Sequence, residues 1–135
     1  MITRVQHRVS FYDTDAMGVV HHANYIRWFE LGRVECLRQV GITLDELMQA
    51  GYVFPITDVR CKYLTAGKFD DVLVIEAKPA ALTKVKMAFD YRILRESDQA
   101  VLVEGHTQNV FTKRETGHIV RLPELFYEKL ARALA

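Results

Sequence analysis

Along this chain the hydrophobic period changes once, and that change leaves few possible folds. Residues 26–40 repeat apolar side chains at helical spacing, whereas from Val53 onward they recur at every second position, as in strands. Strands that follow one another through short turns pair antiparallel. We therefore predict an α+β fold in which a curved antiparallel sheet wraps around one long central helix. Because one helix cannot cover both faces, the other face should meet solvent or a second subunit.

The predicted helix carries one continuous apolar stripe. Its members recur at about 100° per residue, and they are Tyr25, Phe29, Gly32, Cys36 and Val40. Gly32 lowers helix propensity by roughly 1 kcal/mol relative to alanine, so we expect it to permit a close approach to the sheet. Cys36 should be an inert core thiol, and Gly41 should cap the helix.

The remaining elements follow from alternation and from turn residues. A half-buried strand is expected around Val5, Val9 and Phe11, leading into a loop. Further strands are expected at residues 53–64, 72–78, 84–95 and 100–112, with short helices at 44–49 and 123–134. Residues 97–99 should form the turn of a hairpin between the last two strands. Pro55 predicts an edge position or an irregular start for the strand that contains it.

The length and charge of the chain narrow its functional class. A chain of 135 residues fits one domain, residues 1–135, and a formal net charge of +1 gives no reason to expect nucleic-acid binding. The N-terminus lacks a signal-peptide core, and no apolar run reaches the ~18 residues of a membrane span. We therefore expect a cytoplasmic protein without membrane insertion. Cys36 and Cys61 lack metal-ligand spacing, and adjacent side chains such as His21 and His22 point apart, so neither a metal nor another cofactor is expected.

Residues 11–25, FYDTDAMGVVHHANY, lead directly into the predicted helix. Asp13, Thr14 and Asp15 favour turns and helix starts, and Gly18 allows a backbone conformation that other residues resist. A helix N-terminus polarises a carbonyl and stabilises negative charge on its oxygen. A carboxylate beside that point supplies the other half of hydrolytic chemistry. The alternative role for Asp15 is a turn aspartate, which Asp13 fills equally well by residue type.

This segment resembles a known family. The run from Tyr12 to Asp15, then Gly18, Val19, Val20, His22 and Tyr25, followed by Trp28, Phe29 and Glu30, is similar to the opening signature of hotdog-fold acyl-CoA thioesterases. The resemblance is to the 4-hydroxybenzoyl-CoA thioesterase type, especially the bacterial branch associated with the Tol-Pal system. It implies that Asp15 is catalytic, as nucleophile or general base. It also implies that the backbone N–H of His22 hydrogen-bonds the thioester oxygen.

The same resemblance implies where the substrate lies. Gly18, Val19, Val20 and Tyr25 should border it, together with Glu30 and Phe54. Glu30 matches an acidic position of the hydroxybenzoyl pocket, but Phe54 replaces its polar partner. This departure favours aliphatic or plain aromatic acyl groups. Family active sites form between two subunits, so the resemblance implies at least a homodimer, and a homotetramer is expected.

The coenzyme A end of the substrate requires basic residues. Lys84 and Lys86, placed on one strand face, and the pair Lys113 and Arg114 are candidates for contacts with its phosphates, with a solvated strand edge as the alternative role. Two other functions stay open. A hotdog dehydratase would need a catalytic histidine in a proline-rich signature, which is missing, and a non-catalytic acyl-CoA binding module would use the same groove without releasing a thiol.

Overall fold

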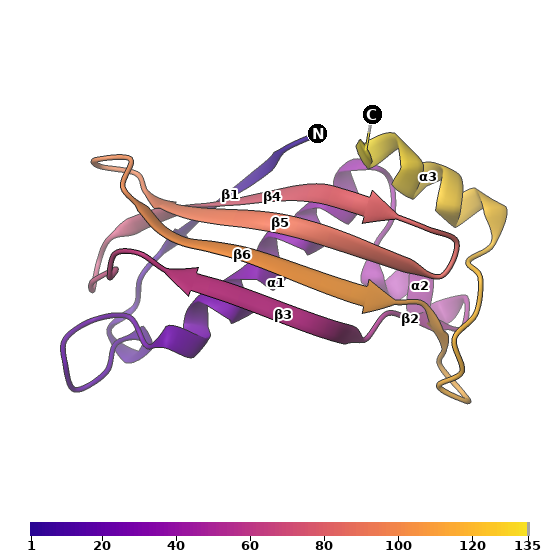
Figure 1. The fold of residues 1–135 in the computed structure, drawn as a ribbon, viewed down its shortest axis with the longest axis horizontal. Coiled ribbons are helices and arrows are strands. Elements are labelled where there is room, and N and C mark those ends of the chain that lie inside the picture. The colour runs from indigo at the N-terminus through magenta and orange to yellow at the C-terminus, as the bar shows by residue number, and fades with distance from the viewer. Residues whose placement is uncertain (135) are drawn as a thin grey trace.

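The computed structural model describes residues 1–134 and has a five-stranded antiparallel sheet. The strands lie in the spatial order β1 (Thr3–Arg8), β4 (Val72–Leu82), β5 (Lys86–Arg95), β6 (Val101–Val110) and β3 (Ile56–Tyr63). The long helix α1 (His22–Gln39) runs beneath this sheet (Figure 1). The predicted α+β class, with a curved antiparallel sheet around one long helix, is therefore confirmed.

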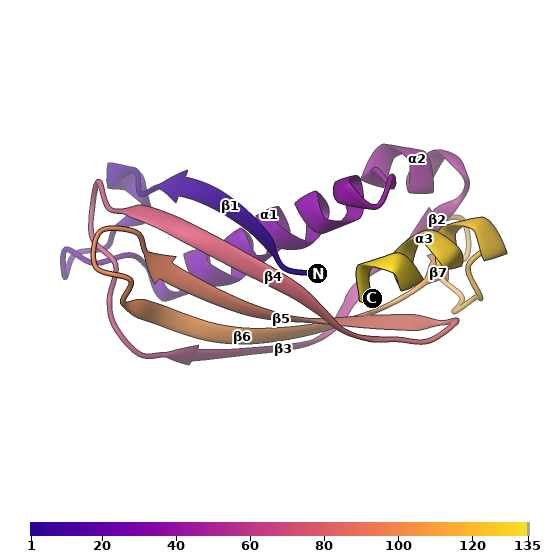
Figure 2. The ribbon, with the colours of Figure 1, turned by 90° about the horizontal axis from the view of Figure 1, so that it is seen from above.

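Smaller elements gather at one end of the sheet. They are α2 (Leu44–Gln49), the two-stranded pair β2 (Tyr52–Val53) and β7 (Thr112–Lys113), and α3 (Glu124–Leu134). Figure 2 shows that all three helices lie on one side of the sheet and that the other side is left uncovered. Within residues 1–134, every helix is too short or too polar to cross a lipid bilayer.

The helix α1 is held very close to the sheet. Tyr25, Phe29, Gly32 and Cys36 are buried, as the apolar stripe predicted. A Cβ atom on Gly32 would lie 2.9 Å from the Cβ of Ala77 in β4, which confirms the predicted close approach. The helix ends as predicted, because Gly41 has a φ of +84° and its N–H donates to the carbonyl of Arg38 at 3.0 Å.

Several element boundaries differ from the sequence prediction. The helix begins four residues before Ile26, because the turn preceding it ends at His21. The first strand ends at Arg8, and the expected inward position of Phe11 is wrong: this residue lies in a 3₁₀ turn with 75% of its surface exposed. The third predicted strand continues past Lys78 to Leu82, because a bulge after Pro79 accommodates the proline.

The strand predicted at 53–64 is divided in two. Tyr52–Val53 pairs with β7 and Ile56–Tyr63 pairs with β6, so Phe54 and Pro55 form a break between two sheets. A register shift between Ile56 and Asp58 confirms the irregular start that Pro55 predicted, and β3 is an edge strand. One long edge of β3 therefore has no strand beside it within the described chain.

Candidate active site

A buried aspartate anchors the loop that precedes α1. Asp13 is 6% exposed, and its Oδ2 accepts the backbone N–H of Ser10 at 2.9 Å. Its carbonyl oxygen accepts the backbone N–H of His21 at 2.9 Å and the Nδ2 of Asn24 at 2.8 Å. Asp13 therefore ties the loop to the first turn of α1, which is a structural role.

Asp15 lies in a tight turn on the solvent side of this anchor. The turn is closed by the N–H of Gly18, which donates to the Asp15 carbonyl at 3.0 Å, and Gly18 has a φ of +78° that favours glycine. The Asp15 Oδ1 accepts the backbone N–H of Met17 at 2.8 Å. No hydrogen bond within residues 1–134 uses its Oδ2. One carboxylate oxygen is thus held by the turn while the other stays available to a ligand.

The first turn of α1 leaves one backbone donor free. The helix is capped by His21, not by Asp13, Thr14 or Asp15: the His21 Nδ1 accepts the N–H of Ala23 at 3.1 Å. The N–H of Asn24 donates to the carbonyl of His21 at 3.0 Å. The N–H of His22, the first helical residue, has no partner in the described part of the chain. It lies at the positive end of the helix dipole.

Asp15 and His22 share one hollow of about 290 Å³. Its lining comprises Asp15, Met17, Val19, Val20, His22, Tyr25, Tyr63, Leu64, Thr65 and Ala66. The structure thus brings together Asp15, Val19, Val20, His22 and Tyr25 from the sequence prediction, and Gly18 shapes the turn beside them. The residue that carries the available carboxylate oxygen and the residue that carries the unpaired helix N-terminal amide therefore line the same cavity.

The far wall of this hollow comes from the end of β3 and the loop after it. The hydroxyl of Tyr63 donates to the carbonyl of His22 at 2.8 Å, and the N–H of Gly67 donates to the hydroxyl of Tyr25 at 3.0 Å. Arg95 holds the same loop, because its Nη2 donates to the carbonyl of Ala66 at 2.9 Å. The sequence prediction missed this wall, since nothing local links residues 63–66 to residue 15.

The two tyrosines of the hollow stay protonated at neutral pH. Burial of its ring raises the pKa of Tyr25. Burial, followed by the neighbouring Cys61 thiol, raises the pKa of Tyr63 to about 12. Neither phenol therefore acts as a base at neutral pH, and the side chains of this hollow that can accept a proton are the Asp15 carboxylate and the His22 imidazole.

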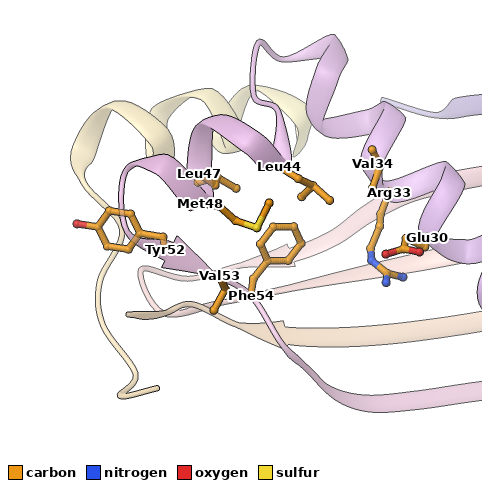
Figure 3. Close-up of a pocket in the computed structure, with 9 residues that line it drawn as sticks. All are labelled: Glu30, Arg33, Val34, Leu44, Leu47, Met48, Tyr52, Val53 and Phe54. Carbon is orange, nitrogen blue, oxygen red and sulfur yellow. The ribbon is translucent and has the colours of Figure 1, made fainter. Parts of the chain in front are cut away.

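Glu30 and Phe54 border a different hollow, of about 170 Å³. Figure 3 shows the Phe54 ring among Leu44, Met48 and Val53, with Glu30, Arg33 and Val34 contributed by α1. Glu30 lies eight residues after His22, or roughly 12 Å along the helix axis. Within one chain, therefore, the structure does not bring Glu30 and Phe54 together with Asp15. The sequence prediction also missed Arg33 as a lining residue.

The four basic candidates separate into two groups. Lys113 and Arg114 border a third hollow, which shares Tyr52 with the hollow of Figure 3. The prediction that Lys84 and Lys86 share a strand face is wrong, because Lys84 lies in the turn before β5. Its Nζ lies 3.0 Å from the Oε2 of Glu124 and 4.0 Å from the ring centre of Tyr127, so α3 engages it. Lys86 is exposed at the start of β5.

No metal-binding arrangement is present among residues 1–134, where no three His, Cys, Asp or Glu side chains come together. The expectation that the side chains of His21 and His22 point apart is wrong, because His21 precedes the helix and its ring stacks on that of His22 with the centres 4.3 Å apart. The chemistry that the described residues of the Asp15 hollow offer is therefore that of a carboxylate, a backbone amide, an imidazole and two neutral phenols.

Comparison with known proteins supports one family. The sequence profile of the thioesterase-like superfamily matches residues 9–130. A putative esterase of Aquifex aeolicus is 34% identical over 123 residues, covering 91% of this chain and 93% of that protein. The acyl-CoA thioesterase YbgC of Haemophilus influenzae is 34% identical over 91 residues, or 67% of each chain.

A solved structure agrees with these sequence matches. The crystal structure of a hypothetical protein from Thermus thermophilus superimposes with a TM-score of 0.90 at 28% identity, covering 98% of both chains. The profile match, the relatives and the fold all point to the same conclusion. The chain belongs to the thioesterase-like superfamily and is a thioester hydrolase with the hotdog fold.

Proposed function

We propose that this protein hydrolyses acyl-CoA thioesters to a free acid and coenzyme A, with Asp15 as the catalytic carboxylate. The observation that carries the proposal is the hollow in which Asp15 meets the unpaired N–H of His22 at the start of α1. The N–H would donate to the thioester carbonyl oxygen, and the helix dipole would stabilise the negative charge that develops there. Val19, Val20 and Tyr25 would border the thioester, and Gly18 would keep the Asp15 turn closed.

Two routes are compatible with this arrangement. As nucleophile, Asp15 attacks the carbonyl carbon, the thiolate of coenzyme A leaves, and water then hydrolyses the mixed anhydride. As general base, Asp15 takes a proton from a water that attacks the carbon directly, and the thiolate leaves with a proton. A single turnover in ¹⁸O-labelled water identifies the first route if label enters the Asp15 side chain. Label only in the product acid fits the second route and also attack of water on the acyl carbon of the anhydride. Rapid quenching and mass measurement of an acyl adduct on Asp15 then separate these two cases.

The acyl group requires a pocket, and a second copy of the chain would supply it. Strand β3 has a free edge, and the residues near the hollow expose apolar surface, including Phe11, Tyr12 and Met17. If β3 pairs antiparallel with the β3 of a second copy, the Tyr63 end of one strand lies beside the Phe54 end of the other. The Asp15 hollow of one subunit would then open toward the Glu30 and Phe54 hollow of the partner.

Mixing two inactive variants tests this composite site. Asp15→Asn removes the carboxylate, and Val34→Trp fills the acyl hollow of Figure 3. In a two-fold symmetric dimer each mixed pair contains one intact site, so an equal mixture should recover about a quarter of wild-type activity. Each variant alone is the control. No recovery in mixed dimers, demonstrated by mass, would place the whole site within one chain. Light scattering would show whether the dimers pair further into the expected homotetramer.

Lys113 and Arg114 are the proposed contacts for the coenzyme A phosphates, because their hollow adjoins the acyl hollow. Replacing both with alanine should raise KM several-fold and leave kcat unchanged, and the effect should shrink at high salt. Lys84→Ala is the matched control, since Glu124 already engages that ammonium. Lys86 is the alternative contact, and a larger KM effect of Lys86→Ala would favour it.

The reaction itself is tested by thiol release from a panel of short-to-medium aliphatic and aromatic acyl-CoAs. Release that saturates with substrate supports hydrolysis. Hydration of an enoyl thioester without thiol release would support the dehydratase alternative. Tight binding of acyl-CoA without either reaction would support a non-catalytic binding module.

A further inference from the structure

Asn109 is a buried amide without a hydrogen-bond partner. The residue lies in β6 and is 1% exposed. Neither its Nδ2 nor its Oδ1 has a partner among the side chains and backbone groups that residues 1–134 supply. Buried polar groups in native proteins are nearly always paired, so an amide with both atoms unpaired calls for an explanation.

The neighbouring inward position on the same strand shows the contrast. Thr107, two residues earlier, is also 1% exposed, and its Oγ1 is 2.6 Å from the hydroxyl of Tyr91. Each of these two hydroxyl groups therefore has a hydrogen-bond partner within the core. Asn109 sits between apolar neighbours, beside Met87 in the sheet register, so the protein offers it no comparable group.

Asn109 lines a small cavity next to the acyl hollow. The cavity has a volume of about 10 Å³, and Leu47 and Phe54 line both it and the hollow of Figure 3. That volume is close to the lower limit for one water molecule, which is also the size of one hydroxyl group. Asn109 thus lines a cavity that is separate from the acyl hollow but shares two lining residues with it.

Phe54 and Leu47 are the side chains that line both spaces, and Phe54 is the one outside regular secondary structure. It lies in the break between β2 and β3, where no strand pairing fixes the backbone, and it is half-buried. A change of its side-chain rotamer would join the hollow to the cavity without disturbing either sheet.

We propose that the acyl pocket continues behind Phe54 to Asn109, and that the Asn109 amide selects acyl groups that carry a hydroxyl at their far end. This inference rests on the proposed thioesterase function. An amide offers a donor and an acceptor, and a hydroxyl both donates and accepts, so one hydroxyl satisfies both atoms. A carbonyl would pair only with the Nδ2, and a methyl group would leave both atoms unpaired. This selection would narrow the sequence-based preference for aliphatic or plain aromatic acyl groups to those with a terminal hydroxyl.

Matched substrates test this selection. The measurement is the ratio of kcat/KM for a medium-chain acyl-CoA with a terminal hydroxyl to that for the unsubstituted acyl-CoA of the same length. In the wild type this ratio should be at least about ten, because a site with buried polar groups rejects the analogue that leaves them unpaired. In Asn109→Leu, which keeps the volume but not the hydrogen bonds, the ratio should fall below one.

A control substitution and a second variant make the result decisive. Gln108→Leu makes a similar change on the neighbouring residue, whose side chain bonds Thr57 on the exposed side, and it should leave the ratio unchanged. If Asn109→Leu does not fold, Asn109→Val replaces it. The same ratio in the wild type and in the apolar variant would overturn the proposal. A wild-type preference for the unsubstituted chain would also overturn it.

A binding measurement separates this inference from the proposed reaction. If no acyl-CoA releases thiol, hydrolysis fails, but calorimetry with the matching alkyl-CoA thioethers still measures the hydroxyl preference. A preference in the wild type that Asn109→Leu loses would support the pocket without the reaction. Equal affinity for the two thioethers in the wild type would refute it.

Discussion

Replacing Gly32 with alanine should destabilise the protein even though alanine favours helices. In an exposed helix the change would stabilise by about 1 kcal/mol. Here the new Cβ would lie 2.9 Å from the Cβ of Ala77 and 3.3 Å from the Cγ2 of Ile75. Ala77 belongs to β4, which is paired on both sides and cannot move away. Overpacking of this kind costs about 1–3 kcal/mol.

The two effects should combine to a net loss of up to roughly 2 kcal/mol, which lowers Tm by up to roughly 10 °C for a chain of this size. Urea denaturation at one fixed protein concentration measures the loss, because association would change the apparent stability. Ala77→Gly is the partner variant. In the double variant Gly32→Ala/Ala77→Gly the contact is absent, so the two single losses should not add. A Gly32→Ala variant more stable than the wild type would refute the close packing of α1 on β4.

Three further predictions concern the wall of the hollow, its tyrosines and the cysteines. Arg95→Met should lower kcat/KM several-fold and the free energy of unfolding by about 1–3 kcal/mol, because Arg95 holds the loop after β3. The control is Arg92→Met, on the exposed face of the sheet, which should have a smaller effect on both quantities. The pKa of Tyr63 in the folded state is raised to about 12, so its contribution to stability should be fully present below the unfolded pKa near ~10 and be lost as pH rises from there toward 12. Tyr63→Phe should flatten that loss of stability, and an unchanged pH profile in this variant would contradict the prediction. A thiol reagent should label Cys61 before Cys36, which is 0% exposed, and early labelling of Cys36 would contradict its core position.

The fold was predictable because its main signals are local. Helical spacing around Phe29 and alternation from Val53 onward both report which side of an element is buried, and the glycines at 32 and 41 mark a close approach and a helix end. Strand order is not a local property. The pairing of β3 with β6 depends on packing of the whole chain, so no pattern within residues 53–64 could reveal it.

Errors arose where a pattern was correct but the backbone turned. Phe11 keeps the alternation of the first strand, but the chain has already entered a 3₁₀ turn. The apolar residues around Pro55 read as one strand, although the proline divides them between two sheets. Alternation reports the side of a strand but not the point at which the strand ends.

The candidate site was predictable in the part that is continuous in sequence. Asp15 and His22 lie seven residues apart and meet in one hollow. Tyr63 lines that hollow and Arg95 holds its loop, both from distant segments, and only the three-dimensional arrangement links them to it. Asn109 carried no signal at all, because a polar residue in an alternating strand is expected to face solvent.

The central claim is that the Asp15 carboxylate performs the chemistry, and one comparison tests it most directly. Asp15→Asn keeps the side-chain oxygen that accepts the Met17 N–H at 2.8 Å, so the turn and the Tm should persist. Loss of the charge should lower kcat for thiol release by at least about 100-fold, the usual contribution of a positioned base. Asp45→Asn, on α2, should behave like the wild type. Wild-type kcat in a folded Asp15→Asn protein would contradict the account.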